Sequence, residues 1–169
     1  MSPEQLILVG APAAGKTVVG GLVAGRLGVP FTDTDELLAQ ALGLSLPEAW
    51  ASVPAQRIAE LELELCTAAL AGPGIIALGS RAVAEPELRA LLAGRRVVWL
   101  RVSPTQITRR LGMAGLGMDT LTAIRFRMES LLREREAWYE EVTTLRLETD
   151  RLDVASVADQ VGQAWEGMT

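Results

Sequence analysis

The chain has 169 residues, of which 49% are hydrophobic and 22% are charged, and its net charge is −5. That length suits one globular domain, and we predict a single domain over residues 1–169. The acidic balance argues against nucleic acid as a partner. No apolar run reaches membrane-spanning length and no signal-peptide pattern opens the chain, so we expect a cytoplasmic protein that makes no membrane contact.

Histidine is absent and cysteine occurs once, at Cys66. The absence of histidine excludes histidine-based catalysis and the commonest zinc ligand. A single cysteine excludes an internal disulfide and fits a reducing compartment. Cys66 lies within a helical pattern beside Leu63 and Leu65, which predicts buried packing rather than chemistry.

Strands and helices alternate along the chain, which predicts a parallel sheet with helices on both faces, an α/β/α architecture. Residues 112–119 hold three glycines and no lysine or arginine, and we expect them to form a mobile lid. Short apolar runs predict strands at about 5–9, 30–32, 75–78, 97–100 and 145–147. Helical spacing predicts helices at about 15–27, 45–50, 85–92, 103–111, 120–141 and 154–165, with one that ends at Gly43 and one that starts at Pro54.

Residues 10–17, Gly-Ala-Pro-Ala-Ala-Gly-Lys-Thr, fit the phosphate-binding pattern G-x-x-x-x-G-K-[ST]. A predicted strand precedes them and a predicted helix follows, as this motif requires. Backbone N–H groups of the loop are expected to surround phosphate oxygens, helped by the partial positive charge of the helix N-terminus. Lys16 would reach the β- and γ-phosphates, and the Thr17 hydroxyl would bind Mg²⁺. The predicted ATP ligands are Gly10, Ala13, Ala14, Gly15, Lys16 and Thr17.

Asp33 and Asp35 leave the second predicted strand at the sheet edge that also carries the phosphate loop. On an extended segment, two carboxylates at i and i+2 point to opposite sides, so one would face Mg²⁺ and the other an acceptor hydroxyl. Aspartate is also common just before a helix, where it caps the first turn. Both interpretations stand. Arg81 follows the third predicted strand at the same edge, where it is either an anion contact or a surface charge.

These segments together resemble the shikimate kinase family of P-loop kinases. The resemblance runs from residue 6 to about 165, and its most specific part is the phosphate loop followed by Asp33-Thr34-Asp35 and Gly43-Leu44-Ser45. It also covers residues 27–32, 78–79, 97–100, 109–110 and 135–139. It implies a five-stranded parallel sheet and transfer of the ATP γ-phosphate to a hydroxyl in aromatic amino acid biosynthesis, and we expect a monomer.

The resemblance also implies roles for single residues. Lys16 and Asp35 would be catalytic, with Asp35 as the base that contacts the acceptor hydroxyls. Thr17 and Asp33 would lie at the magnesium ion, and Arg110 would lie against the adenine. The implied acceptor ligands are Asp35, Gly79, Arg81 and Arg135, with Arg135 on a carboxylate.

The chain departs from the family pattern around the acceptor. Ala59 stands where the family has an arginine, and Arg57, two positions earlier, points elsewhere on the helix. Gly79-Ser80-Arg81 replaces three glycines, and the predicted lid lacks the arginine that precedes a proline. We hypothesise that Arg81 restores the missing positive charge. Arg125 or Arg127 could replace the lid arginine, although an exposed helix face explains both.

Three functions follow from these observations. The first is an ATP- and Mg²⁺-dependent kinase that acts on shikimate or on a related polyol or sugar acid, such as gluconate. The second is a nucleotide-binding sensor that has lost efficient phosphoryl transfer, which the arginine-free lid favours and Asp35 opposes. The third is a nucleotide kinase, for which the lid lacks the basic residues that a second phosphate needs.

Overall fold

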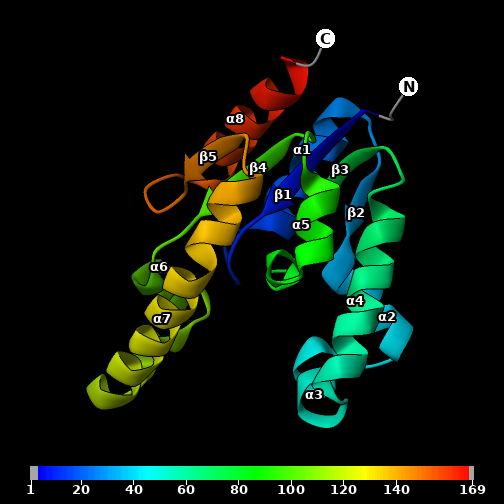
Figure 1. Cartoon of the computed structure of the whole chain (residues 1–169). Helices are drawn as coiled ribbons and strands as arrows, with labels where there is room; N and C mark the ends of the chain where they lie inside the picture. Colours follow the sequence, from blue (N-terminus) through cyan, green and yellow to red (C-terminus); the bar gives the residue numbers. More distant parts are fainter. Residues whose placement is uncertain (1–3, 168–169) are drawn as a thin grey trace.

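A computed structural model describes residues 4–167 and contains one five-stranded sheet in which every neighbouring pair is parallel (Figure 1). The strand order is β2-β3-β1-β4-β5. The predicted α/β class and five-stranded parallel sheet are therefore confirmed. The strands are β1 (Gln5–Val9), β2 (Phe31–Asp33), β3 (Gly74–Ala77), β4 (Val97–Arg101) and β5 (Leu145–Glu148).

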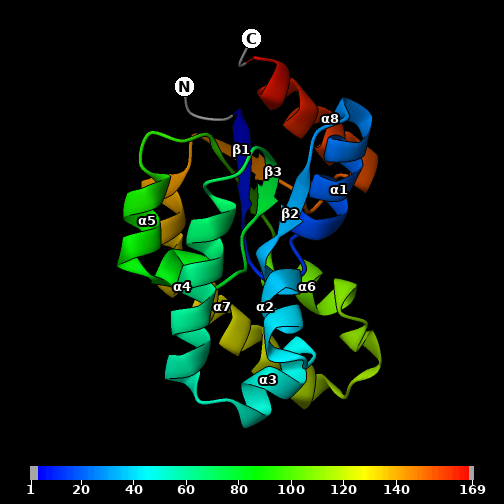
Figure 2. The same ribbon diagram turned by 90° about the vertical axis from the view of Figure 1, so that its right-hand side faces the viewer.

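Helices cover both faces of the sheet, which gives three layers (Figure 2). One face carries α1, α6 and α8, and the other carries α4, α5 and α7. The helices are α1 (Lys16–Leu27), α2 (Thr34–Leu42), α3 (Leu46–Ser52), α4 (Ala55–Ala69), α5 (Pro86–Leu92), α6 (Pro104–Arg110), α7 (Met118–Val142) and α8 (Val154–Glu166), with 3₁₀ turns η1 (Ala82–Ala84) and η2 (Met113–Gly115).

The central strand β1 shows why this sheet needs two helical layers. Leu6 and Leu8 pack among the residues of α1 and α8, whereas Ile7 and Val9 pack among those of α4, α5 and α7. All four side chains are at most 1% exposed. A continuous apolar run of this kind is stable only when both faces of its strand are buried, as in parallel sheets.

Parallel strands end at one edge of the sheet, and the segments that follow them meet there. Helices α2 and α3 extend beyond this edge on one side, and α6, η2 and the first turns of α7 extend beyond it on the other (Figure 1). The helix predicted from residue 45 begins at a capping box, in which Ser45 and Glu48 satisfy each other's backbone N–H groups at the start of α3.

Part of the predicted lid, residues 112–119, forms regular secondary structure. Residues 113–115 form the 3₁₀ turn η2, and α7 begins at Met118, two residues before the predicted start. Mobility of residues 112–119 stays a prediction. So does the single domain over residues 1–169, whose ends at 1–3 and 168–169 lie outside the described residues.

Two further predictions concern the burial of Cys66 and the absence of membrane-spanning segments. Cys66 is fully buried on α4, and burial raises the pKa of its thiol to about 12, as suits a packing residue. Within residues 4–167, the structure has no helix with the length and apolar character needed to cross a membrane.

Gly74 and Gly25 give a matched test of the fold. Gly74 has φ +96°, and a Cβ there would overlap the carbonyl oxygen of Pro30, the residue just before the neighbouring strand β2. Gly74→Ala should lower the free energy of unfolding by more than about 1 kcal/mol. Gly25 is exposed within α1 and has nothing within 4 Å of its Cβ position, so Gly25→Ala should raise it by about 0.5–1 kcal/mol. Urea denaturation measures both, and similar effects of the two changes would contradict this account.

Candidate active site

The phosphate loop connects β1 to α1 and lies against the end of β4. A Cβ on Gly10 would lie 2.5 Å from the carbonyl oxygen of Leu100, so only glycine allows this close approach. Ala13 has φ +60°, a left-handed conformation that costs a non-glycine residue about 1 kcal/mol or more. Such strain is typical of functional loops.

Lys16 folds back over the loop. Its Nζ donates hydrogen bonds to the carbonyl oxygens of Gly10, at 2.8 Å, and Ala11, at 3.1 Å. Burial lowers the pKa of Lys16 to about 8, and the nearby carboxylates of Asp35 and Asp33 oppose that shift. The ammonium group is therefore held beside the loop and between two acidic side chains.

Asp33 joins the loop to β2. Its Oδ2 accepts a 2.5 Å hydrogen bond from the Thr17 hydroxyl, and its Oδ1 accepts from the backbone N–H groups of Asp35 and Glu36. Asp33 therefore caps α2 and faces Thr17 at once, so it is the helix cap that one interpretation describes, while its role at Mg²⁺ stays a prediction. The expected extended segment through Asp35 is wrong, because the cap starts α2 at Thr34 and places Asp35 in its first turn.

Thr17 and Asp33 form a donor set that fits magnesium. A hydroxyl and a carboxylate are hard oxygen ligands, which Mg²⁺ prefers. Residues 4–167 contain no group of three or more acidic, cysteine or histidine side chains arranged to hold a metal. Mg²⁺ usually takes one or two protein ligands and completes its shell with water and phosphate, so this pair suits an ion carried in with a nucleotide.

A cavity of about 320 Å³ lies beside the loop at the carboxyl edge of the sheet. It brings together three of the predicted acceptor residues, Asp35, Arg81 and Arg135, which come from α2, the segment after β3 and α7. Its full lining is Pro12, Asp35, Leu46, Trp50, Glu62, Ser80, Arg81, Leu131 and Arg135.

Arg135 is fixed by contacts to the segment after β3. Its Nη1 donates to the carbonyl oxygen of Ser80 at 2.8 Å, and the Tyr139 hydroxyl donates to the same oxygen at 3.1 Å. Tyr139 is buried and stacks on Trp99, with ring centroids 5.2 Å apart. This stack anchors the turn of α7 that follows Arg135, so the guanidinium is held at the cavity wall.

Gly79, the fourth predicted acceptor residue, leaves room for two carboxylates. A Cβ at this position would lie 2.5 Å from Oδ1 of Asp35 and 3.0 Å from Oε1 of Glu62. The Gly79 N–H donates to the Thr34 hydroxyl at 2.9 Å, which ties β3 to the start of α2. Glycine is therefore required at position 79 because a larger residue would collide with the carboxyl groups of Asp35 and Glu62.

Glu62 is a cavity residue that the sequence analysis missed. It is 4% exposed, and burial raises the pKa of its carboxyl to about 7, with Arg81 opposing the rise and Asp35 adding to it. One signal was available: Ile58, Glu62 and Cys66 recur at intervals of four on α4, and these three are its buried residues. A lone carboxylate in such a row predicts a buried polar site.

Three arginines that the sequence analysis considered as substitutes, Arg57, Arg125 and Arg127, are exposed. Arg57 is 61% exposed at its side chain, pairs with Glu60, and does not line the cavity. Arg125 and Arg127 are exposed on α7, which agrees with the helix-face explanation. Arg81 is the added cation at the cavity, and its guanidinium carbon lies 4.1 Å from the centre of the Trp50 ring.

Arg110 lies on the other side of the phosphate loop. Its Nη1 donates to the carbonyl oxygen of Ala13, at 3.1 Å, and to the hydroxyl of Thr149, at 3.2 Å, while its Nη2 donates to the Thr149 carbonyl oxygen. It therefore joins the loop to the segment that follows β5.

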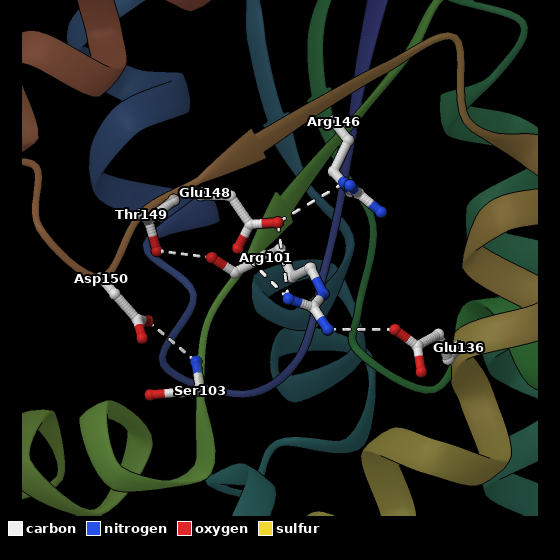
Figure 3. A network of polar contacts seen from close by, with 7 residues as sticks. All are labelled: Arg101, Ser103, Glu136, Arg146, Glu148, Thr149 and Asp150. Carbon is white, nitrogen blue, oxygen red and sulfur yellow. Dashed lines mark hydrogen bonds and ion pairs between the residues drawn. The ribbon is translucent and has the colours of Figure 1, made fainter.

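A polar network around Arg101 holds these segments together (Figure 3). Arg101, at the end of β4, pairs with Glu136 of α7 at 3.0 Å and with Glu148 of β5 at 3.3 Å. The Thr149 hydroxyl donates to the Arg101 carbonyl oxygen, and the N–H of Ser103 donates to Asp150. The network links α7, beside Arg135, to the segment that holds Arg110.

A strand, phosphate loop and helix at the centre of a parallel sheet, with a cavity beside them that is lined by both carboxyl groups and arginines, are the features of a P-loop kinase of small molecules. A family model described as shikimate kinase matches residues 12–166. The shikimate kinase of Frankia casuarinae is 39% identical over 95% of this chain and 72% of that protein, and that of Thermobifida fusca is 35% identical over 96% of each. The chain belongs to the shikimate kinase family and is an ATP-dependent kinase with an alcohol group as acceptor.

Solved structures agree with this fold. The shikimate kinase of Acinetobacter baumannii, determined in complex with shikimate, matches with a TM-score of 0.86 at 22% identity and covers 99% of this chain and 96% of that one. A gluconokinase from Sinorhizobium meliloti matches with a TM-score of 0.60 at 17% identity and covers 99% of this chain and 94% of that one. The resemblance to the shikimate kinase family found in the sequence is confirmed.

The raised pKa of Glu62 predicts how its contribution to stability depends on pH. Because the folded state holds the Glu62 proton to about pH 7 while the ordinary value is 4.5, the folded state binds more protons between these values. Wild type should therefore lose stability relative to Glu62→Gln as pH rises from 4.5 to 7, by at most about 3 kcal/mol. Urea denaturation at several pH values measures this. Glu64→Gln removes an exposed carboxylate from the same helix as a control, and a Glu62 effect that is constant with pH would contradict the prediction.

Proposed function

We propose that this chain transfers the γ-phosphate of ATP to a hydroxyl of shikimate, which binds in the cavity lined by Asp35, Glu62 and Arg135. The observation that supports this most is the position of Asp35. Its carboxylate lies in the cavity and close enough to the buried Lys16 for each charge to affect the pKa of the other. An acid-base group therefore faces the acceptor space beside the phosphate-binding lysine.

In the proposed reaction, Asp35 accepts the proton of the acceptor hydroxyl. The hydroxyl oxygen forms a bond to the γ-phosphorus, and the bond from that phosphorus to the bridging oxygen of ADP breaks. Burial raises the pKa of Asp35, which makes it a better proton acceptor than an exposed carboxylate, and Lys16 limits the rise. Arg135 would hold the carboxylate of shikimate and so orient the reacting hydroxyl.

The nucleotide half would use the loop and two oxygen ligands. The N–H groups at Gly10, Ala13, Ala14 and Gly15 would bind phosphate oxygens, and Lys16 would neutralise charge on the β- and γ-phosphates. Thr17 and Asp33 would hold Mg²⁺, which supplies charge neutralisation at the phosphates when bound. Arg110, fixed to Ala13 and Thr149, would place its planar guanidinium against the adenine.

The lid supports a second candidate, a nucleotide-binding sensor with little phosphoryl transfer. Residues 112–119 contain no lysine or arginine. A transition-state arginine can contribute about 10³- to 10⁵-fold in phosphoryl transfer, so its absence would slow a kinase greatly unless another cation serves. A monomeric state and a cytoplasmic location stay predictions.

Asp35→Asn tests the proposal. ADP release from Mg-ATP should depend on shikimate, and gluconate and nucleoside monophosphates should give little or none. Asp35→Asn should lower kcat by at least about 100-fold, because the amide cannot accept the proton, while ATP affinity stays close to wild type. ATP binding without shikimate-dependent ADP release in wild type would instead support the sensor. Stimulation by gluconate alone would replace shikimate as the acceptor.

A further inference from the structure

Arg81 lines the acceptor cavity and is held there by an aromatic ring. Its guanidinium lies over the ring of Trp50, 4.1 Å from the ring centre, and Trp50 is itself 38% exposed. Within residues 4–167, the Arg81 side chain donates no hydrogen bond and forms no ion pair. A cation–π contact uses the face of the guanidinium and leaves its N–H groups, which point outward in the plane, available for a ligand.

The surroundings of Arg81 favour an anionic ligand. The cavity holds two arginines, Arg81 and Arg135, and two carboxyl groups, Asp35 and Glu62. Glu62 carries a proton over much of the range below neutral pH, because burial raises the pKa of its carboxyl to about 7. Below neutral pH, Glu62 therefore offsets the two guanidinium groups of Arg81 and Arg135 only in part.

The two arginines are held from different sides. Arg81 stacks on Trp50 of α3. Arg135 of α7 donates a hydrogen bond through Nη1 to the Ser80 carbonyl oxygen. Ser80 and Arg81 are consecutive, so the short segment that carries Arg81 also supplies the carbonyl oxygen that holds Arg135. A planar carboxylate suits such a pair, because each oxygen can accept from a different guanidinium.

We infer that Arg81, whose guanidinium lies over the Trp50 ring, is a specificity-determining residue that acts beside Arg135 to select acceptors with a carboxylate. This inference rests on the proposed function and names the substrate feature that the cavity reads. It also gives Trp50 a function, since the indole ring orients the guanidinium that binds the ligand. Lysine in place of Arg81 would keep the charge but lose both the stack and the planar fork.

The test compares shikimate with its methyl ester, which keeps the hydroxyls and lacks the charge. Arg81→Gln should lower kcat/KM for shikimate by about 10- to 100-fold, the usual range for losing a charge-assisted hydrogen bond, and should leave kcat/KM for the ester little changed. Arg81→Lys should give an intermediate loss. Trp50→Leu should lower kcat/KM for shikimate selectively, because it removes the platform without touching a charge. Arg57→Gln removes an exposed arginine of α4 outside the cavity and serves as the matched control.

The possible results separate this inference from the proposed function. A loss for shikimate alone supports Arg81 as the carboxylate reader, whereas unchanged kinetics, or equal losses for shikimate and the ester, would overturn it. If wild type shows no shikimate-dependent ADP release, the proposed function fails, and calorimetric binding of shikimate then decides the role of Arg81. In that case weaker binding to Arg81→Gln than to wild type and Arg57→Gln supports the inference, and equal or absent binding overturns it.

Discussion

The geometry of the site depends on the hydrogen bond from the Thr17 hydroxyl to Asp33. This bond joins the nucleotide half of the site, which holds the phosphate loop, to the acceptor half, which is the cavity lined by Asp35. Thr17 lies in the first turn of α1, directly after the phosphate loop, and Asp33 ends β2 and caps α2. One carboxylate oxygen faces the loop and the other holds the turn that carries Asp35. The Asp33 side chain therefore joins the first turn of α1 to the turn that carries Asp35.

Much of the fold could be predicted from the sequence because its signals are local. Short apolar runs mark the strands, and breaks such as Pro73-Gly74 separate them from the helices. The capping box at Ser45 and Glu48 places the start of α3 to the residue. The order of the strands was not predicted, because each segment alone says nothing of its neighbours in the sheet.

The acceptor half was harder to predict because its contacts join segments that are far apart in the sequence. Glu62 stands in a helix with several apolar residues, and only its register with Ile58 and Cys66 reveals that it is buried. The stack of Arg81 on Trp50 joins residues 31 positions apart, and no local pattern encodes it. Asp35 was found by its spacing, although the Asp33 cap that turns it into α2 was left open.

This difference has a physical basis in how each half is built. Most of the nucleotide half is one continuous segment whose backbone would supply the phosphate ligands, and its conformation leaves little freedom in residue type at Gly10 or Lys16. The acceptor half draws side chains from α2, α3, α4, α7 and the segment after β3. A cation can reach one point in such a cavity from more than one wall. Arg81 in the segment after β3 supplies a positive charge at one wall of this cavity, whereas position 59 of α4 is alanine and does not line it.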